Sequence, residues 1–300
     1  MSERKTIYLC LAHMSEDGVE QKYVKEAFDT NWVVPMGPNV NAFEQNLADF
    51  SNAMSDGSKL DRKVVCLSAG TAAVHLALIA CGVQAGDEVC VQSFTFCASS
   101  HPITYLGATP VFIDSERDTW NMDSELLEKA ILDRKEKTGK YPKAIIPVAL
   151  YGMPYDCERI MAVAEKYGIP VIEDAAEGMG SRFDGQVLGT FGRFGVLSFN
   201  GNKMITTSGG GALICRSVED ANQIMWYATQ ARDAYPYYEH TAIGYNYRMS
   251  NVCAGIGRGQ MTVLEEHIAH HKHVQELYRQ LLKDIPGITL HDQPNDGRYD

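Results

Sequence analysis

Apolar and polar residues alternate along the chain with two different periods, which indicate two kinds of structure. Residues 19–30 and 40–50 carry apolar side chains every three or four positions, which predicts two amphipathic helices separated by a loop that holds Pro35 and Pro38. From Lys63 onward, short β-branched runs alternate with amphipathic segments, separated by a few turn residues. This rhythm is typical of βαβ units and predicts a parallel sheet flanked by helices.

Strands and helices can be assigned to individual runs. Strands are predicted over residues 64–67, 88–91, 110–113, 144–148, 170–172, 195–199 and 211–215. Helices are predicted over residues 71–81, 98–105, 123–133 and 157–167, and one long helix over 252–282. The last two strands are joined across Ser208-Gly209-Gly210, where glycine suits a tight turn better than a phosphate cradle.

The chain ends soon after the predicted long helix, at Asp300. We expect an α/β architecture of this kind to continue into a smaller second domain, so the C-terminal domain should be incomplete in this sequence. The boundaries that follow are a large domain over residues 1–245, and a connecting helix with the start of the small domain over residues 246–300.

Composition and charge exclude several classes of protein. A chain of 300 residues with 45% hydrophobic and 22% charged residues is globular, and is neither disordered nor collagen-like. A net charge of −11 without any basic run argues against binding to nucleic acid or anionic lipid. No apolar run reaches the roughly 18 residues of a membrane helix, and residues 1–5 lead into no signal-peptide core. We therefore expect a cytoplasmic protein.

Cysteine usage agrees with a reducing compartment. The eight cysteines form no C-x-x-C pair. Most of them lie within apolar runs, namely Cys66, Cys81, Cys90, Cys97 and Cys215. We expect reduced core thiols and neither a disulfide framework nor a zinc site.

The first segment with candidate chemistry is the small-residue turn over residues 68–73, between a predicted strand and a predicted helix. Backbone N–H groups at such a helix N-terminus, together with a hydroxyl, make a natural seat for a phosphate. An ordinary N-cap by Ser68 or Thr71 would explain the same residues equally well.

The second segment carries carboxylates directly after a predicted strand. Glu173 and Asp174 follow the apolar run, and Glu177 comes three residues after Asp174. Carboxylates at a strand end can bind a metal, act as acid and base, or pair with a cationic ligand. Alternatively, Glu173 and Glu177 face solvent while Asp174 caps a turn. For Glu173 we favour this simpler interpretation.

The third segment places Lys203 in a loop of small and polar residues just past a strand. Most lysines are solvated surface charges, but a lysine at a buried strand end can form a Schiff base. A phosphate seat, an acid and a lysine are together what pyridoxal 5′-phosphate requires: its phosphate must be anchored, its ring nitrogen kept protonated and its aldehyde held as an imine. The combination favours an enzyme that uses this cofactor.

Several longer motifs make the sequence recognisable. They are Ala69-Gly70-Thr71-Ala72-Ala73-Val74-His75-Leu76, Gly86-Asp87-Glu88-Val89, Ser93-Phe94-Thr95-Phe96, Ile172-Glu173-Asp174-Ala175-Ala176-Glu177, residues 198–211 and Gly244-Tyr245-Asn246-Tyr247-Arg248. In these motifs the chain, from about residue 7 to about residue 282, resembles the DegT/StrS family of fold-type I aminotransferases that act on nucleotide-linked keto-sugars. Residues 198–211 are most similar to the subgroup that aminates UDP-4-keto-6-deoxy-N-acetylglucosamine on the route to bacillosamine.

The resemblance implies a fold and a cofactor. The fold is an α/β architecture with a mostly parallel central sheet flanked by helices, in which residues 1–245 form the domain that binds pyridoxal phosphate. Lys203 would form the Schiff base and shuttle the substrate proton, and Asp174 would hold the pyridinium N–H. Removing one partner of such a buried charge pair costs about 3 to 5 kcal/mol.

The same resemblance implies the remaining cofactor contacts. Phosphate ligands would come from the turn at Gly70, Thr71 and the Ala72 amide, and from Ser198. Phe96 would stack on the ring, the alternative being a core residue beside Phe94. Glu177 would lie near the ring oxygen, where Glu is usual in the bacillosamine-like subgroup. Asn246 would reach the phosphate bound by the neighbouring subunit, which implies a homodimer with shared active sites.

The activity implied is the transfer of an amino group, from L-glutamate, to C4 of a UDP-linked 4-keto-6-deoxy-N-acetylhexosamine. Two alternatives keep the fold. One is an aminotransferase for another nucleotide keto-sugar, of the perosamine or amino-arabinose type. The other is a non-catalytic regulatory or binding protein, against which the negative charge and the lack of a basic recognition helix speak.

Other polar residues have simpler interpretations. Four histidines lie between residues 267 and 273, and the i, i+4 pair His267 and His271 has metal-ligand spacing. A solvated helix face explains them better, so we expect no metal. Arg232 and Arg248 either meet a carboxylate or nucleotide phosphate bidentately, or form surface ion pairs.

Overall fold

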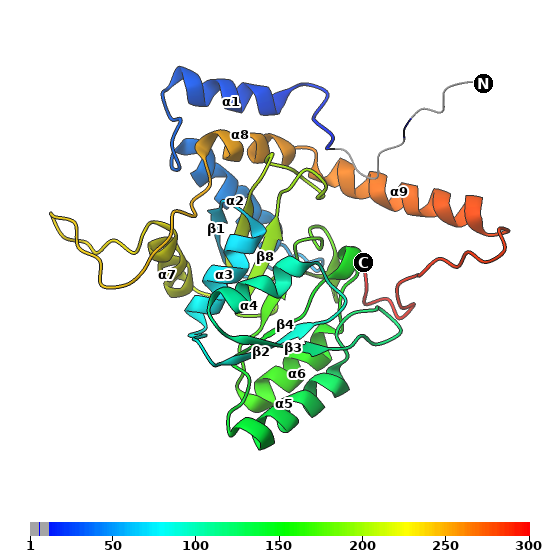
Figure 1. Ribbon diagram of the computed structural model, residues 1–300. Coiled ribbons are helices and arrows are strands. Elements are labelled where there is room, and N and C mark those ends of the chain that lie inside the picture. The colour runs from blue at the N-terminus through cyan, green and yellow to red at the C-terminus, as the bar shows by residue number, and fades with distance from the viewer. Residues whose placement is uncertain (1–5, 7–11) are drawn as a thin grey trace.

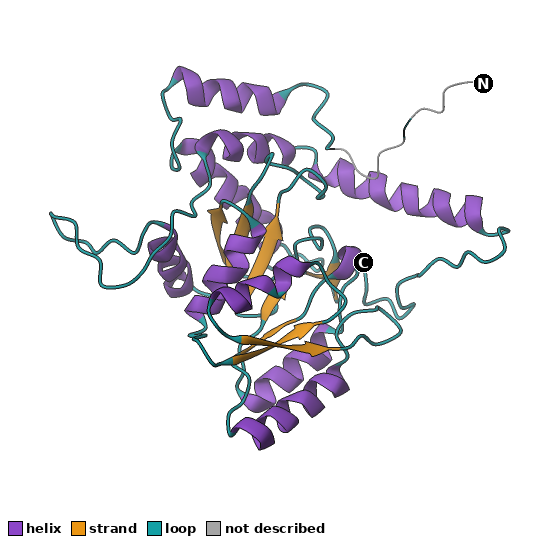
Figure 2. Ribbon diagram, viewed as in Figure 1, coloured by secondary structure: helices purple, strands orange, loops and turns teal. Residues whose placement is uncertain are grey.

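The computed structural model describes residue 6 and residues 12–300, so the expectations for residues 1–5 and for the start of the resemblance at residue 7 lie outside the described residues. Helices cover both faces of a central sheet (Figures 1 and 2). The helices are α1 (Val19–Asp29), α2 (Pro38–Asn52), α3 (Gly70–Ala80), α4 (His101–Tyr105), α5 (Ser124–Thr138), α6 (Cys157–Tyr167), α7 (Val218–Ala228), α8 (Asn251–Gln260) and α9 (Leu264–Leu282). The strands are β1 (Lys63–Leu67), β2 (Glu88–Gln92), β3 (Thr109–Ile113), β4 (Ala144–Ile146), β5 (Ile172–Asp174), β6 (Arg182–Phe183), β7 (Gln186–Val187), β8 (Phe194–Ser198) and β9 (Gly211–Cys215).

The central sheet is mostly parallel, as the sequence predicts. Strands pair in the orders β1-β9-β8-β5 and β3-β2-β4. Two parallel bridges, Ile145 to Val171 and Val148 to Asp174, connect β4 to β5 and join the two groups. Strand β9 runs antiparallel to β1 and β8, whereas β2 is parallel to β3 and β4, and β5 to β8. The exception is β9 because the chain returns to it from β8 through a loop and not through a crossover helix.

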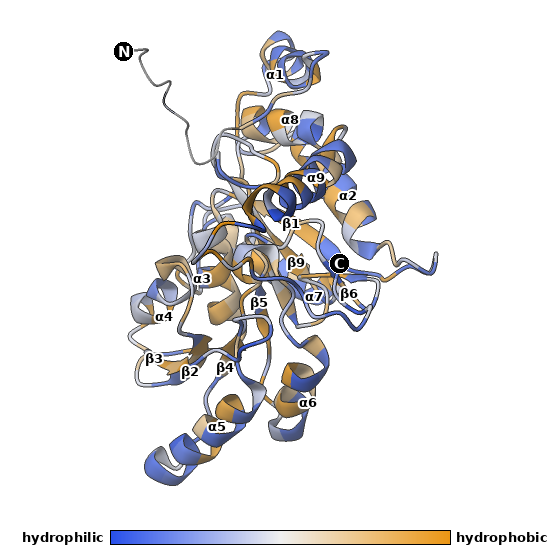
Figure 3. Cartoon of the chain, turned by 90° about the vertical axis from the view of Figure 1, so that its right-hand side faces the viewer, coloured by the Kyte–Doolittle hydropathy of each residue, from blue (hydrophilic) through white to orange (hydrophobic). Residues whose placement is uncertain are grey.

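Alternate strand residues point to opposite faces, and each face carries its own core. In β1, Val64 and Cys66 belong to the core under α2, α5 and α6, whereas Val65 and Leu67 belong to the core under α3, α4 and α7. Helix α3 is buried almost all round, and Figure 3 shows its apolar composition in contrast to the hydrophilic outer end of α5. The dense packing of α3 holds its N-terminus in a fixed place beside the sheet.

The single long helix predicted over residues 252–282 is wrong. Helix α8 ends at Gln260 and α9 begins at Leu264, because Thr262 and Val263 donate their N–H groups three residues back, to Gly259 and Gln260. The Gln260 side chain is 1% exposed and donates to Glu20 and to the backbone carbonyl of His13. This contact holds α8 against α1, while α9 projects from the body (Figure 1).

The connection from β8 to β9 also differs from the prediction. The chain makes no tight turn at 208–210; residues 199–210 form a wide loop, closed by a 3.0 Å hydrogen bond from Phe199 N to Gly210 O. Ser208 adopts a left-handed conformation with φ of 71°. The loop carries Lys203. Helix α7 and the hairpin β6–β7 were not anticipated from the sequence.

Cysteine burial follows the expectation with one exception. Cys66, Cys81, Cys90 and Cys215 are buried free thiols, but Cys97 is exposed. Cys97 lies in a short turn after β2, where the apolar run continues past the end of the strand. Within the described part of the chain, no helix has both the length and the apolar character needed to cross a membrane.

Candidate active site

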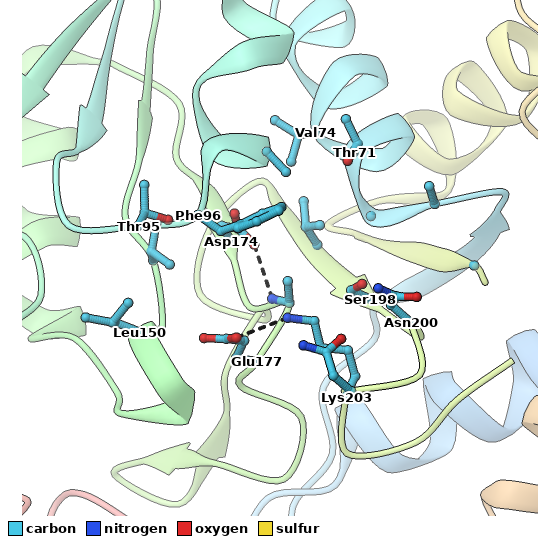
Figure 4. Close-up of a pocket in the computed structure, with 18 of the residues that line it drawn as sticks. Thr71, Val74, Thr95, Phe96, Leu150, Asp174, Glu177, Ser198, Asn200 and Lys203 are labelled. Carbon is cyan, nitrogen blue, oxygen red and sulfur yellow. Dashed lines mark hydrogen bonds and ion pairs between the residues drawn. The ribbon is translucent and has the colours of Figure 1, made fainter. Parts of the chain in front are cut away.

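A cavity of about 470 Å³ lies at the carboxyl ends of β4, β5 and β8. Open α/β sheets bind their ligands at such ends. The walls come from the N-terminus of α3, from the loops that follow β2 and β4, from the turn after β5, and from the β8–β9 loop. The three sequence segments with candidate chemistry therefore meet in one place (Figure 4).

The N-terminus of α3 faces Ser198 across the cavity wall. The N-cap residue is Ala69, and among the described residues no side chain caps the first turn, so the capping role considered for Ser68 or Thr71 is wrong. A Cβ at Gly70 would lie 3.1 Å from Ser198 Cβ and 3.4 Å from Ser198 Oγ. Glycine thus lets a hydroxyl approach the uncapped N–H groups, which together form a seat for an anion.

Thr71 and Ala72 follow Gly70 in the first turn of α3. Thr71 lines the cavity, as Gly70 and Ser198 do. Ala72 is 6% exposed and contributes no cavity surface. Ala72 can therefore offer a ligand its backbone N–H, which is the group expected from the resemblance.

Asp174 ends β5 and is 6% exposed at the cavity floor. Its Oδ2 accepts a hydrogen bond from Ser99 Oγ at 2.6 Å, and its Oδ1 accepts one from Ala176 N at 3.2 Å. Burial raises the pKa of this carboxyl above its ordinary value, although both hydrogen bonds and the charge of Lys203 oppose that change. A cationic ligand in the cavity would stabilise the charged form.

Lys203 and Glu177 form an ion pair inside the cavity, with Nζ and Oε1 3.1 Å apart. The Lys203 side chain is only 16% exposed, so it is not the solvated surface lysine of the simpler interpretation. Glu177 Oε2 accepts the backbone N–H of Tyr151 at 2.8 Å. These contacts orient the Lys203 amine toward the turn after β5 (Figure 4).

Phe96 lines the cavity and is 76% exposed, so the alternative of a core phenylalanine is wrong. Phe94, its neighbour in the motif, is 47% exposed and also lines the cavity. An exposed aromatic ring at a cavity wall is available to stack on a planar ligand.

Glu173 is a correction, because it does not face solvent. It is 1% exposed, and its carboxylate accepts N–H groups from Gly189, Phe191 and Gly192 at 2.7 to 3.0 Å. Burial raises the pKa of Glu173, and these backbone donors counteract the rise. Glu173 therefore anchors the loop that leads into β8, and it does not line the cavity.

Several residues that shape the cavity were not predicted from the sequence. Gln92 and Asn121 are fully buried amides joined at 3.1 Å, and Gln92 also holds the Phe94 carbonyl. Asn121 accepts the N–H of Leu150 and so fixes the loop that carries Tyr151. Tyr151 has a φ of 53°. Gln92 stands directly before the motif at residues 93–96, and this position is the one signal that the sequence offered.

Asn246 and the two arginines lie outside the cavity. Asn246 is exposed and bridges Thr229 in an antiparallel pair. Arg232 is exposed, with its guanidinium 4.2 Å from the centre of the Tyr238 ring. Arg248 pairs with Glu44 at 2.6 Å, and its side chain is 8% exposed. Arg248 therefore meets a carboxylate of the protein in a buried ion pair, so the surface pairing considered for it is wrong.

The histidine cluster at the start of α9 also remains outside the cavity. His267 Nδ1 lies 3.2 Å from the backbone carbonyl of Met204, next to Lys203. The rings of His270 and His271 are 6.3 Å apart at their centres. In the described ranges, 6 and 12–300, no group of three or more His, Cys, Asp or Glu residues is arranged to hold a metal ion.

The cavity residues fit pyridoxal phosphate. A phosphate dianion suits the uncapped N–H groups of α3 beside the Ser198 hydroxyl. A protonated ring nitrogen suits Asp174, whose raised pKa reflects a buried charge that needs a cation. Lys203 supplies a primary amine within the same cavity, whose volume is in the usual range for cofactor sites.

Comparisons with known proteins agree with this chemistry. The family model described as the DegT/DnrJ/EryC1/StrS aminotransferase family matches residues 14–299. EpsN of Bacillus subtilis (strain 168), provisionally named a pyridoxal phosphate-dependent aminotransferase, is 45% identical over 95% of this chain and 71% of its own length. GDP-perosamine synthase of Escherichia coli O157:H7 is 35% identical over 96% of this chain and 75% of its own.

A solved structure of a relative has the same fold. An aminotransferase of this family from Brucella abortus superposes with a TM-score of 0.86 at 29% identity, over 94% of this chain and 72% of its own. The comparisons confirm the fold-type I architecture, the aminotransferase activity and the pyridoxal phosphate cofactor expected from the motifs. The chain belongs to the DegT/DnrJ/EryC1/StrS aminotransferase family, as a sugar aminotransferase that depends on pyridoxal phosphate.

Proposed function

We propose that this sugar aminotransferase transfers an amino group from L-glutamate to C4 of a UDP-linked 4-keto-6-deoxy-N-acetylhexosamine. The observation that carries the proposal is the convergence of Lys203, Asp174 and the N-terminus of α3 on one cavity. The choice of sugar rests on the resemblance of residues 198–211 to the bacillosamine-type subgroup. Pyridoxal phosphate, when bound, supplies an electron sink for the electrons of the broken C–H bond.

Lys203 is the proposed catalytic base. Its Nζ would hold the cofactor, then take the proton from the α-carbon of glutamate and later deliver a proton to C4 of the sugar. Glu177 lies 3.1 Å from that nitrogen and holds it in place through an ion pair. The ion pair is partly exposed, which leaves room for a ligand group near the ring oxygen to approach Glu177.

Asp174 is the proposed partner of the ring N–H. Its burial removes competing water, so a cation beside it interacts strongly with the carboxylate. The side chain of Thr71, the N–H groups of Gly70 and Ala72, and the hydroxyl of Ser198 would hold the phosphate. Phe96 would cover the ring, for which its exposed position is suitable.

We further propose a homodimer in which Asn246 completes the phosphate site of the partner subunit. Support comes from the segment between α7 and α8, which projects from the body as an arm (Figure 1). The arm exposes Tyr235, Tyr237, Tyr238 and Ile243 by 53% to 82%. A monomer has no evident use for such a surface. A second proposal concerns the domains, with residues 1–245 as the cofactor domain and residues 246–300 as the connecting segment and the start of a small C-terminal domain.

Free thiols at the seven described cysteines support a cytoplasmic location, where thiols stay reduced.

The proposed activity is tested by incubating the loaded enzyme with L-glutamate and UDP-4-keto-6-deoxy-N-acetylglucosamine, and by identifying the product by mass spectrometry and NMR. We expect a UDP-linked 4-amino sugar and stoichiometric 2-oxoglutarate, formed by the wild type and by Lys272→Ala but not by Lys203→Ala. Lys272 is an exposed lysine on α9 and is therefore a matched control. No turnover of any UDP-linked keto-sugar would contradict the sugar assignment.

A second candidate substrate is a GDP-linked 4-keto-6-deoxy sugar. The observation that favours it is the 35% identity to GDP-perosamine synthase over nearly the whole chain. The two candidates are separated by kcat/KM for the UDP and GDP substrates at equal concentrations of L-glutamate. A preference of at least about a hundredfold, or 2.7 kcal/mol in transition-state binding, would assign the nucleotide.

A further inference from the structure

Two hydroxyl side chains lie behind Asp174, and no role described above uses them. Ser99 is 1% exposed, in the short turn after β2. Its Oγ donates to Asp174 Oδ2 at 2.6 Å, and Thr95 Oγ1 lies 2.7 Å from Ser99 Oγ. Thr95 lines the cavity. A chain of two hydroxyls therefore runs from the cavity wall to the buried carboxylate.

The direction of these hydrogen bonds follows from the number of hydrogens. A serine hydroxyl has one hydrogen, and Ser99 gives it to Asp174. Thr95 must then donate its own hydrogen to Ser99 Oγ, so every donor in the chain points toward the carboxylate. Chains of hydrogen bonds that share one direction strengthen each other.

The carboxylate is held on both of its oxygens. Ser99 occupies one side of Oδ2, and the backbone N–H of Ala176 contacts Oδ1 at 3.2 Å. Rotation of the carboxylate plane would break one of these contacts. The remaining lone pairs are left for a donor in the cavity, which Asp174 lines.

The same contacts favour the charged form of Asp174. Burial is the largest influence and raises its pKa, and the hydrogen bond from Ser99 is the largest influence that lowers it. The Ala176 N–H and the charge of Lys203 act in the same direction as Ser99, whereas the charge of Glu177 opposes them. Loss of the Ser99 hydroxyl would leave a buried carboxyl that is more readily neutralised.

We propose that Ser99 and Thr95 are positioning residues that keep the Asp174 carboxylate charged and oriented to accept the ring N–H of pyridoxal phosphate. The inference rests on the role proposed above for Asp174. Neither hydroxyl touches reacting atoms; both act through the carboxylate. Ser100, the next residue, offers the matched control, because its hydroxyl donates only to the Cys97 carbonyl within the same turn.

The test measures the dissociation constant of pyridoxal phosphate by spectral titration between pH 6 and pH 8. We expect Ser99→Ala to weaken binding about tenfold, the size of one lost hydrogen bond to a charged group. Thr95→Val should weaken it less, and Ser99→Thr, which keeps the hydroxyl, should stay within about threefold of wild type. Ser100→Ala should leave the constant unchanged.

The effect of Ser99→Ala on cofactor affinity should depend on pH in a defined direction. Without the Ser99 hydroxyl, Asp174 takes up a proton at higher pH, so the affinity ratio between wild type and Ser99→Ala should grow as pH falls. Titration of the cofactor itself affects both proteins and cancels in the ratio. In an Asp174→Asn background, Ser99→Ala should change the constant less than about twofold, because no charge remains to be positioned.

The outcomes separate this inference from the proposed function. If Asp174→Asn weakens binding and Ser99→Ala does not at any pH, the positioning role is wrong while the role of Asp174 stands. If Asp174→Asn leaves both affinity and the spectrum of the bound cofactor unchanged, the role of Asp174 itself is wrong. If Ser99→Ala does not fold, Thr95→Val decides, since wild-type affinity in that variant would refute the hydroxyl chain.

Discussion

Replacing Gly70 with alanine perturbs the anion seat without removing a functional group. Gly70 is the first residue of α3, and its Cβ would meet Ser198 Cβ at 3.1 Å and Ser198 Oγ at 3.4 Å. The first distance is shorter than ordinary van der Waals contact, so either Ser198 or the helix must move by a few tenths of an ångström. Both carry groups that we assign to the phosphate, and their spacing would change.

The expected loss of cofactor affinity follows from the contacts at risk. A hydrogen bond to a charged group contributes about 1.5 to 3 kcal/mol, so misplacing one should weaken pyridoxal phosphate binding about ten- to a hundredfold. The free energy of unfolding of Gly70→Ala should change much less than its cofactor affinity. Alanine is favoured over glycine in a helix by about 0.5 to 1 kcal/mol, which offsets the crowding at Ser198.

The assay is a titration of pyridoxal phosphate into Gly70→Ala, paired with urea unfolding of the same protein without cofactor. Gly201→Ala is the matched control, because it lies in the loop that carries Lys203 and its Cβ would have no atom within 4 Å. We expect Gly201→Ala to bind as wild type does. Equal affinity in the two variants, or a loss in Gly70→Ala that unfolding accounts for completely, would refute the assignment of the seat.

Three further predictions concern stability and reactivity. Glu173→Gln should lower the free energy of unfolding by about 1 to 3 kcal/mol, because its NH₂ group must face a backbone N–H. Burial raises the pKa of Glu173 in the folded protein, so its contribution to the free energy of unfolding is present at acidic pH and is lost as pH rises through that pKa. The difference in free energy of unfolding between wild type and Glu173→Gln, measured with urea, should therefore become smaller as pH rises. Arg248→Ala leaves the Glu44 carboxylate unpaired and mostly buried, and should cost about 3 to 5 kcal/mol in the same assay. Under native conditions an alkylating reagent should label exposed Cys97 well before Cys81, which is buried with its pKa raised to about 12, and peptide mass spectrometry would show the order.

Most parts of the site that could be predicted lie at or just after the ends of buried strands. Asp174 ends one strand, Ser198 ends another, and the turn before Thr71 follows a third. Parallel strands bring their carboxyl ends to one edge of the sheet, so residues far apart in the chain meet there and line one cavity. Lys203 lies further along, in the loop that follows Ser198, and lines the same cavity.

The parts that could not be predicted depend on tertiary packing. No hydrophobic periodicity or motif singles out Ser99 or Gln92. Their roles depend on hydrogen bonds to Asp174 and Asn121, which lie 75 and 29 residues away in the sequence. Glu173 has the alternating position of a solvent-facing residue. It is nevertheless buried, and its carboxylate accepts three backbone N–H groups from the loop before β8. The interruption before Leu264 contains neither glycine nor proline, so helical periodicity continues through it.

The central claim is that Lys203 holds the cofactor and takes up the amino-donor proton. Its most direct test is the visible absorption spectrum of the protein with and without L-glutamate, recorded beside Lys203→Ala and Lys272→Ala. The account predicts a cofactor band that bleaches with glutamate in the wild type and in Lys272→Ala, but not in Lys203→Ala. A band that bleaches equally in Lys203→Ala, or a wild-type protein that pyridoxal phosphate cannot reconstitute, would contradict it.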